Sequence, residues 1–199
     1  HGSFFELFRD TKMNAQTETE KLNEVDKQKY RRNQFGGSFG GPIVKDKAHF
    51  FGAVERTNQD TFQSVSTLGL FPFLDGIYAT PYRETLLVVK GTANVSARQF
   101  LSVRYGRNQN TQPYGADAQT AVNGWGQSDN KFNSFNINHN LVVGADKLNE
   151  AIFQYADFRN HIGANSTDPL QTFPNGVSVG QSSATPQTTE QKKWQFRDD

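Results

Sequence analysis

Apolar and polar residues alternate along much of the chain, which is the period-two pattern of β-strands that have one apolar face. The clearest segment is Lys131–Val143. One face of this segment holds Phe135, Ile137, His139, Leu141 and Val143, and the other holds Ser134, Asn136, Asn138 and Asn140. The pattern predicts a strand that lies between an apolar and a polar environment.

Other segments repeat the alternation. In Arg32–Ile43, one face carries Phe35, Gly37, Phe39, Gly41 and Ile43, and the opposite face carries Gln34, Gly36, Ser38 and Gly40. Two shorter segments place Leu101, Val103 and Tyr105 against Ser102 and Arg104, and Ala151, Phe153 and Tyr155 against Gln154 and Ala156. Helical periodicity is scarce: the best candidate, Thr11–Lys29, is polar almost throughout and has no apolar face to bury.

Short and long connections alternate between these segments. The short turns are Val44–Lys47, Asn94–Ser96 and Gly144–Lys147, and the long polar loops are Asp10–Lys29, Asn58–Thr80, Asn108–Asn130 and Ile162–Glu190. In an up-and-down antiparallel sheet, this order places every short turn at one end and every long loop at the other. Transmembrane β-barrels have that arrangement. We therefore predict an all-β fold, a portion of an antiparallel up-and-down transmembrane β-barrel that contributes about eight strands to a larger barrel.

Composition agrees with a barrel once the alternation is known. Only 35% of the 199 residues are hydrophobic and mean hydropathy is −0.71, yet the chain has 17 Phe, 6 Tyr and 2 Trp. A barrel wall needs an apolar residue only at every second position, so low hydropathy and many aromatics fit together. No apolar run approaches the roughly 20 residues of a membrane-spanning helix. The chain begins and ends inside patterned segments, and we interpret it as a piece of something longer.

The stretch "RRNQFGGSFGGPIVKDKAHFFGAVERT" is the most distinctive in the sequence. Glycine in a strand leaves room for close approach, and proline belongs near a strand end. We expect Gly36 and Gly40 to thin the polar side, where something inside the barrel could pack, and Gly37 and Gly41 to thin the apolar side. Pro42 precedes the predicted tight turn. His49, Phe50 and Phe51 are expected in an interfacial aromatic girdle.

This stretch resembles a hairpin of the Oar-like TonB-dependent receptors, in which N-Q-F-G-G-x-x-G-G-P-I-x-K-D-K-x-F-F-F-G recurs. The chain matches the pattern from Asn33 to Gly52, except that His49 stands where the family usually has an aromatic residue. "HGSFFELFRDTKMNA" is similar to the family's first barrel strand, and "ETLLVVKGTANVSARQFLSVRYGRNQN" is similar to its next hairpin.

The resemblance implies that residues 1–199 are a partial receptor barrel in the outer membrane of a Gram-negative cell. Plug, TonB box and regulatory-like domain have no counterpart in the sequence. The implied partners are outer-membrane lipid and lipopolysaccharide, the plug of the same receptor, TonB acting through the missing segments, and a bulky ligand that is taken up. A structural or adhesive cell-surface β-sheet protein without transport activity is the alternative.

We expect five polar residues to face the lumen, namely Gln34, Arg104, Asn136, Asn138 and Gln154. The loops after Asn58, Asn108 and Ile162 are expected to face outward and to help select the ligand. The aromatic residues of Leu68–Tyr82 could line a ligand entrance or could pack the loop on itself. Four scattered histidines, no cysteine, a net charge of +1 and no phosphate-binding glycine motif favour no enzyme, no cofactor, no metal and no nucleic-acid partner.

Overall fold

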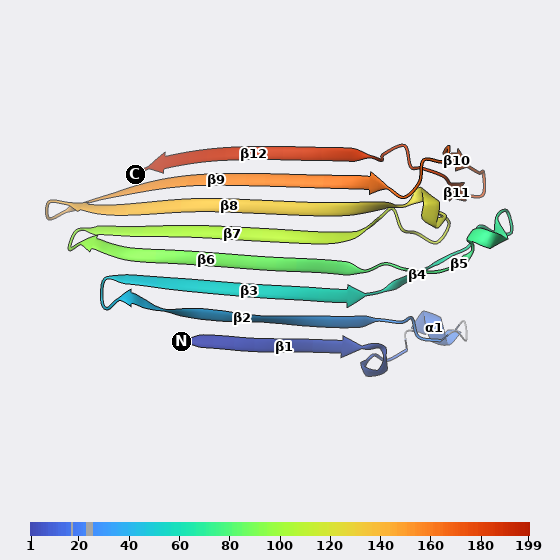
Figure 1. Ribbon diagram of the computed structural model, residues 1–199, viewed down its shortest axis with the longest axis horizontal. Helices are drawn as coiled ribbons and strands as arrows, with labels where there is room; N and C mark the ends of the chain where they lie inside the picture. Colours follow the sequence, from blue (N-terminus) through green and yellow to red (C-terminus); the bar gives the residue numbers. More distant parts are fainter. Residues whose placement is uncertain (17, 23–25) are drawn as a thin grey trace.

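The computed structural model describes residues 1–16, 18–22 and 26–199. Its main feature is one antiparallel sheet of eight strands in the order β1-β2-β3-β6-β7-β8-β9-β12. The strands are β1 (Gly2–Asp10), β2 (Arg31–Val44), β3 (Ala48–Asp60), β6 (Tyr82–Ser96), β7 (Gln99–Tyr114), β8 (Gly126–Val143), β9 (Lys147–Ala164) and β12 (Gln187–Asp198). Each strand pairs with its predecessor in the sheet, so the up-and-down, all-β prediction is confirmed (Figure 1).

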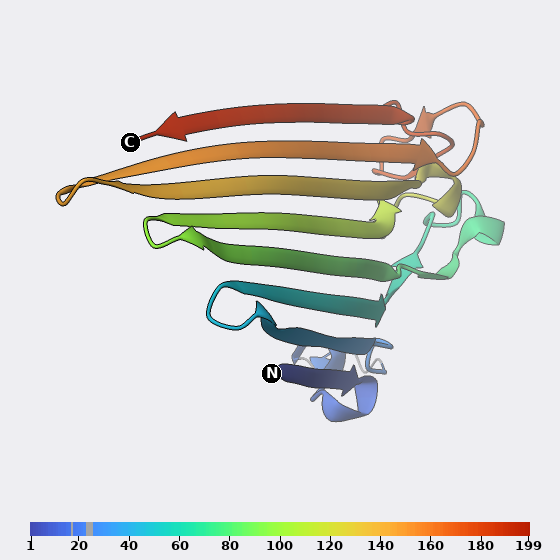
Figure 2. The ribbon, with the colours of Figure 1, turned by 60° about the vertical axis from the view of Figure 1, so that its left-hand side comes forward.

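The sheet is open. β1 and β12 lie at its two edges, and each pairs with one neighbour only. Figure 2, turned by 60°, shows the strands as a single layer, with the smaller elements gathered at one end. Sheets in water-soluble domains normally bury at least one face against a second layer. The apolar face of this sheet therefore needs surroundings other than bulk water.

The turns and loops are segregated as predicted. The turns β2–β3, β6–β7 and β8–β9 lie at one end of the sheet, and the long connections lie at the other (Figure 1). Asp46 and Gly144 adopt left-handed conformations in two of these turns, with φ of 60° and 72°. Asp tolerates that conformation better than most residues, and Gly adopts it freely. The residue types at these two positions thus favour a reversal of the chain there.

Several predicted loop boundaries were wrong. The loop predicted over Asn108–Asn130 is mostly strand, since β7 continues to Tyr114 and β8 begins at Gly126. The loop predicted from Ile162 to Glu190 shrinks in the same way, and the turn predicted at Asn94–Ser96 lies just after Ser96. Polar residues line both faces of the added strand segments, so no apolar alternation marks them. Part of the loop predicted over Asp10–Lys29 lies outside the described residues.

The long connections contain the smaller elements. Two short hairpins are formed by β4 (Phe62–Val65) with β5 (Gly76–Ala79), and by β10 (Gln171–Thr172) with β11 (Ser178–Val179). The helical turns are η1 (Thr11–Met13), α1 (Glu18–Leu22), η2 (Pro72–Leu74) and η3 (Val122–Gly124). In the described part of the chain, no helix has the length and apolarity that a membrane span requires.

Three loops pack together into what we call the loop cap, residues 61–81, 115–125 and 165–186. Its core is Ala121, Val177 and Val179, with Phe71, Leu74 and Phe173 packed around it. Trp125 is 2% exposed and its ring centroid lies 5.8 Å from that of Tyr78. Backbone hydrogen bonds join the loops, from Ser66 N to Ala118 O at 2.8 Å and from Ala121 N to Ser178 O at 2.9 Å. The aromatic residues of Leu68–Tyr82 therefore pack partly against the other two loops.

Candidate functional site

The strand register separates the side chains of the sheet into two faces. Residues that pair across antiparallel strands point to the same side. One continuous row of paired residues is Phe39, Gly52, Val89, Tyr105, Phe135, Tyr155 and Trp194. The next row is Gly41, Phe50, Gly91, Val103, Ile137, Phe153 and Phe196. We call the side that carries these rows the aromatic face.

The aromatic face changes character along the strands. On β8, Phe135, Ile137, Leu141 and Val143 are followed toward the loop end by Asn133, Lys131 and Asp129. On β9, Tyr155 is followed by Asp157 and Arg159. The apolar part of β8 is roughly 30 Å long at about 3.3 Å per residue, less once tilted, which suits the apolar band of about 25 Å on membrane barrels. The loop-end half of the strands extends beyond this belt.

Aromatic rings mark the boundary between the two halves. Tyr105, Phe135, Tyr155 and Trp194 lie on four adjacent strands, and the Tyr155 and Trp194 ring centroids are 4.3 Å apart. The Tyr105 hydroxyl donates to Asn133 Oδ1 at 2.9 Å, one row toward the loops. Rings with an apolar body and a polar tip are typical of the membrane–water interface. Sequence alternation identified Tyr105, Phe135 and Tyr155 singly and did not identify Trp194, and only the register shows that the four form a row.

The predicted girdle at residues 49–51 was wrong in part. Phe50 lies on the aromatic face, with its ring centroid 5.5 Å from that of Phe39. Phe51 and His49 instead lie on the opposite face, where they pair with Gly40 and Pro42. Two adjacent residues of a strand must point to opposite sides, so only one of two consecutive phenylalanines can join a girdle.

The glycine–proline segment has a packing role within the sheet. A Cβ on Gly36 would lie 2.6 Å from Val54 O and 2.9 Å from the Phe5 ring, and one on Gly40 would lie 3.2 Å from the Phe51 ring. Rings of neighbouring strands, those of Phe5 and Phe51, thus approach Gly36 and Gly40, and the packing of a group inside the barrel against this side stays a prediction. Gly37 is close to Ser3 O, Gly41 has open space, and Pro42 precedes a β-bulge.

All five predicted lumen residues lie opposite the aromatic face. Arg104, Asn136 and Gln154 form one paired row across β7, β8 and β9. Asn138 lies in the next row toward the turns and donates to Glu150 Oε1 at 2.7 Å. Gln34 lies on β2, nearer the loop end, and its amide donates to Glu55 Oε1. Arg104, Asn136 and Gln154 lie level with the aromatic boundary row, while Gln34 lies beyond it.

A second polar row on this face was missed by the sequence analysis. It pairs Gln34, Thr57, Glu84, Asn110, Asn130, Asn160 and Thr189 across seven strands. The side chains form a directional chain of hydrogen bonds, from Asn160 to Asn130 (2.8 Å), Asn110 (3.0 Å), Asn108 (3.1 Å) and Glu84 (2.9 Å). We call these five residues the asparagine chain. They lie in the half of the sheet beyond the apolar belt.

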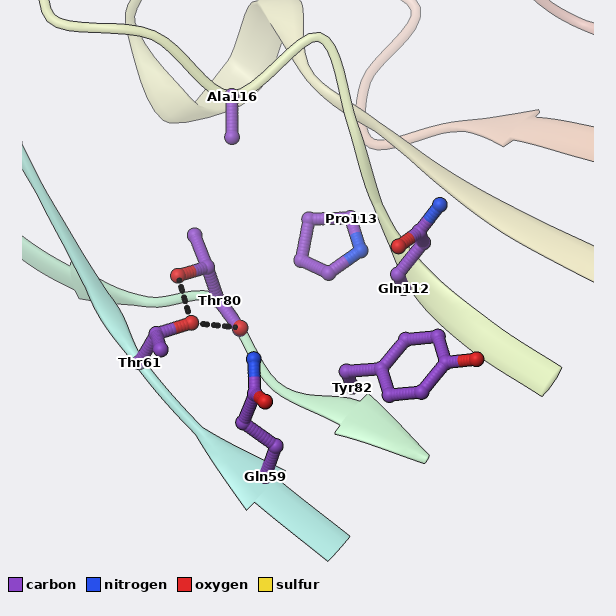
Figure 3. Close-up of a pocket in the computed structure, with 7 residues that line it drawn as sticks. All are labelled: Gln59, Thr61, Thr80, Tyr82, Gln112, Pro113 and Ala116. Carbon is purple, nitrogen blue, oxygen red and sulfur yellow. Dashed lines mark hydrogen bonds between the residues drawn. The ribbon is translucent and has the colours of Figure 1, made fainter. Parts of the chain in front are cut away.

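A pocket lies next to the asparagine chain, one row closer to the loop cap. Its volume is about 430 Å³, and it is lined by Gln59, Thr61, Thr80, Tyr82, Gln112, Pro113 and Ala116. Figure 3 shows Thr61 and Thr80 on one side of the open space and Gln112 and Pro113 on the other. The Thr61 hydroxyl donates to Thr80 O at 2.7 Å, which ties the two strands that leave the sheet here. We call this site the mouth pocket.

Metal-binding geometry is lacking in the parts of the chain that the structure covers: no group of three or more His, Asp or Glu side chains is placed to hold an ion. The titratable group with the clearest role is in the loop cap. The Thr67 hydroxyl and backbone N–H both donate to Asp75 Oδ1 at 2.6 Å and lower the pKa of that carboxyl below its usual value of 3.8.

Comparison with known families agrees with this geometry. A family model described as "Outer membrane beta barrel domain" matches residues 1–75, which include β1, β2, β3 and the glycine–proline segment. No curated protein and no solved structure matches the chain. The family match supports an outer-membrane β-barrel, located in the outer membrane, and the open antiparallel sheet is consistent with it.

Proposed function

We propose that this chain forms part of the barrel wall of a TonB-dependent receptor that takes up a bulky ligand across the outer membrane. The observation that supports the proposal most directly is that the apolar side chains of the sheet are exposed. Phe39 and Trp194 are 64% and 67% exposed on the aromatic face, and no second layer formed by the described residues covers either side of the sheet. Exposed aromatic side chains on this scale are costly in water and favourable in lipid.

The two ends of the sheet support an orientation. Barrels of the outer membrane place short turns in the periplasm and long loops outside. The loop cap would then face the medium, and the face opposite the aromatic one would line the lumen. Gln34, Arg104, Asn136, Asn138 and Gln154 would contact the plug or the passing ligand. Lipid and lipopolysaccharide would contact the aromatic face.

The open edges fit a wall segment. β1 and β12 present unpaired backbone groups along their outer sides, which is a strong drive to pair with further strands. Within a complete barrel those edges would be paired, as hydrocarbon requires. The match over residues 1–75 supports an outer-membrane barrel, and the resemblance of the glycine–proline segment favours a receptor within that class.

The test is genetic and biochemical. The intact protein should fractionate with outer membranes and need detergent for solubility, and its folded form should migrate differently from the heated form on a gel. Uptake of its ligand, identified by growth on defined nutrients, should be lost on deletion of either its gene or tonB. Uptake that persists without tonB would overturn the proposal.

One observation favours the alternative, a structural or adhesive surface protein. The loop cap exposes Phe73, Ile77 and Leu68 at 79%, 74% and 56%, a set of apolar side chains suited to contact with another surface. An adhesive protein would locate to the outer membrane as well, but its loss would alter cell attachment and leave nutrient uptake unchanged.

A further inference from the structure

We propose that the mouth pocket and the asparagine chain bind a neutral oligosaccharide. The inference rests on the proposed function, because it takes the face opposite the aromatic one as the lumen wall. It adds the chemical class of the ligand.

The groups that line the site match sugar hydroxyls. Gln59 and Gln112 offer amides, which donate and accept, and Thr61 and Thr80 offer hydroxyls, which also do both. A sugar hydroxyl likewise donates one hydrogen bond and accepts others. Tyr82, half-buried, adds an aromatic ring against which the C–H face of a pyranose can pack. Pro113 and Ala116 complete the apolar part of the lining.

The charge of the site disfavours an ionic ligand. None of the seven lining residues is charged. Arg83 donates to Gln59 O at 2.6 Å and is paired with Asp60. The charged side chains beside the pocket on its own face are opposite in sign, Arg32 on β2 and Glu84 on β6. Each is engaged by an amide: Arg32 Nη2 donates to Gln34 Oε1 at 2.8 Å, and Asn108 Nδ2 donates to Glu84 Oε1 at 2.9 Å. An anionic ligand would meet the Glu84 carboxylate and a cationic ligand the Arg32 guanidinium, so the two charges together favour neither sign.

The site has the length of an oligomer. Ser128, 5% exposed, pairs with Gln112 and accepts from Asn160 at 3.1 Å, so the mouth pocket and the asparagine chain share one surface. From Glu84 on β6 to Asn160 on β9 the surface crosses three strand spacings, roughly 15 Å. A chain of sugar units lying across the strands would meet amides on β7, β8 and β9.

Hydrogen bonds fix the side chains of the asparagine chain in the absence of a ligand. Each amide donates to the next, and the last donates to a carboxylate, so the hydrogen bonds polarise one another and fix the direction of every amide. Fixed polar groups lose less conformational entropy on binding than free side chains do. Amide oxygens keep a second lone pair, so the chain can still accept from ligand hydroxyls.

Calorimetric titration of the intact protein, purified in detergent, tests the proposal. The probes are maltohexaose, cellohexaose, laminarihexaose and xylohexaose, with trigalacturonate as the anionic comparison and hexaglycine as the peptide comparison. We expect at least one neutral hexasaccharide to bind at least tenfold more tightly than either comparison. The inference is overturned if none of the four binds, or if trigalacturonate or hexaglycine binds more tightly.

Variants localise the binding. Tyr82→Ala should weaken it at least tenfold, and Gln112→Glu, an exposed and nearly isosteric change, about fivefold or more. Gln109→Glu is the matched control, since it makes the same change on β7 but on the aromatic face, and should change affinity less than twofold. Equal affinity for the first two variants and the unmodified protein, each shown folded by heat-dependent gel migration, would overturn the inference. Titration of purified protein does not depend on transport, so its failure is distinct from failure of the proposed uptake.

Discussion

In the loop cap, Ala121 and Val177 are fully buried, whereas in the main sheet Phe4 and Phe196 are 75% and 70% exposed. The difference is not one of composition, because both regions are rich in aromatic residues. The loop cap closes three loops on one another and builds a small core of the kind found in water-soluble domains. The sheet packs its strands only edge to edge and leaves its apolar side chains to an external solvent.

The loop cap and the sheet therefore have different sources of stability. Buried apolar area stabilises the loop cap by the hydrophobic effect in water. Backbone hydrogen bonds between long strands hold the sheet together, and a lipid environment stabilises its aromatic face. Changes in one region should therefore leave the other largely intact.

The largest expected effect is in the loop cap. Trp125→Ala removes a ring that is 2% exposed and whose Nε1 donates to Thr120 O at 2.8 Å, and should destabilise the cap by about 3–5 kcal/mol. Chymotrypsin cleavage at loop aromatics should accelerate strongly, while the heat-dependent gel shift of the barrel stays unchanged. Ile77→Ala, at a position 74% exposed, is the control and should leave cleavage unchanged. Simultaneous loss of the gel shift would show that the two regions are not independent.

A charge on the aromatic face should be the next largest effect. Ile137→Arg places a cation within the apolar belt, one row from its aromatic boundary, and should destabilise the protein in lipid vesicles by about 2–3 kcal/mol. Asn136→Arg, at the adjacent position on the opposite face, should cost less than about 1 kcal/mol in a polar lumen. Urea titration of both variants in vesicles gives the comparison. Equal costs for the two would remove the distinction between a lipid face and a lumen face.

A smaller loss of stability is expected from changes to the glycine packing within the sheet. Gly36→Ala would bring a Cβ to 2.6 Å from Val54 O, and should destabilise by about 1–3 kcal/mol because a backbone atom must move. At Gly91, the same substitution meets nothing within 4 Å and should be close to neutral. The same vesicle titration distinguishes them. A neutral Gly36→Ala would mean that β1 and β3 shift freely against β2.

The same difference between the sheet and the loop cap explains how much of each could be predicted from the sequence. Alternation needs one apolar and one polar face, so the strand around Ile137 was predicted while the polar ends of β7 and β8 were taken for a loop. Asn108, Asn110 and Asn130 of the asparagine chain lie in those polar ends, and the chain was missed for that reason. Arg104, Asn136 and Gln154 were predicted on one face because apolar neighbours flank each of them.

Other features depend on contacts that no local pattern contains. The loop cap brings Phe71 and Phe173 together, with ring centroids 5.6 Å apart, across a hundred residues of sequence. The aromatic row at the belt boundary requires the register of four strands. The motif from Gly36 to Pro42 pointed to the barrel family, but it could not show that the rings of Phe5 and Phe51 approach the glycines.

The smallest expected effect is a pH dependence confined to the loop cap. Because Thr67 holds the pKa of Asp75 below 3.8, the carboxylate stabilises the turn fully above pH 3.8, and this stabilisation is lost as pH falls through the lowered value. Fluorescence of Trp125, which contacts Tyr78, reports the transition when Trp194→Phe removes the other of the two tryptophans. We expect the emission to shift as the pH falls below 3.8 and the shift to vanish in Asp75→Asn. If the transition persists in Asp75→Asn, another carboxyl causes it. If the heat-dependent gel shift of the barrel is lost in the same pH range, the loop cap and the sheet are coupled.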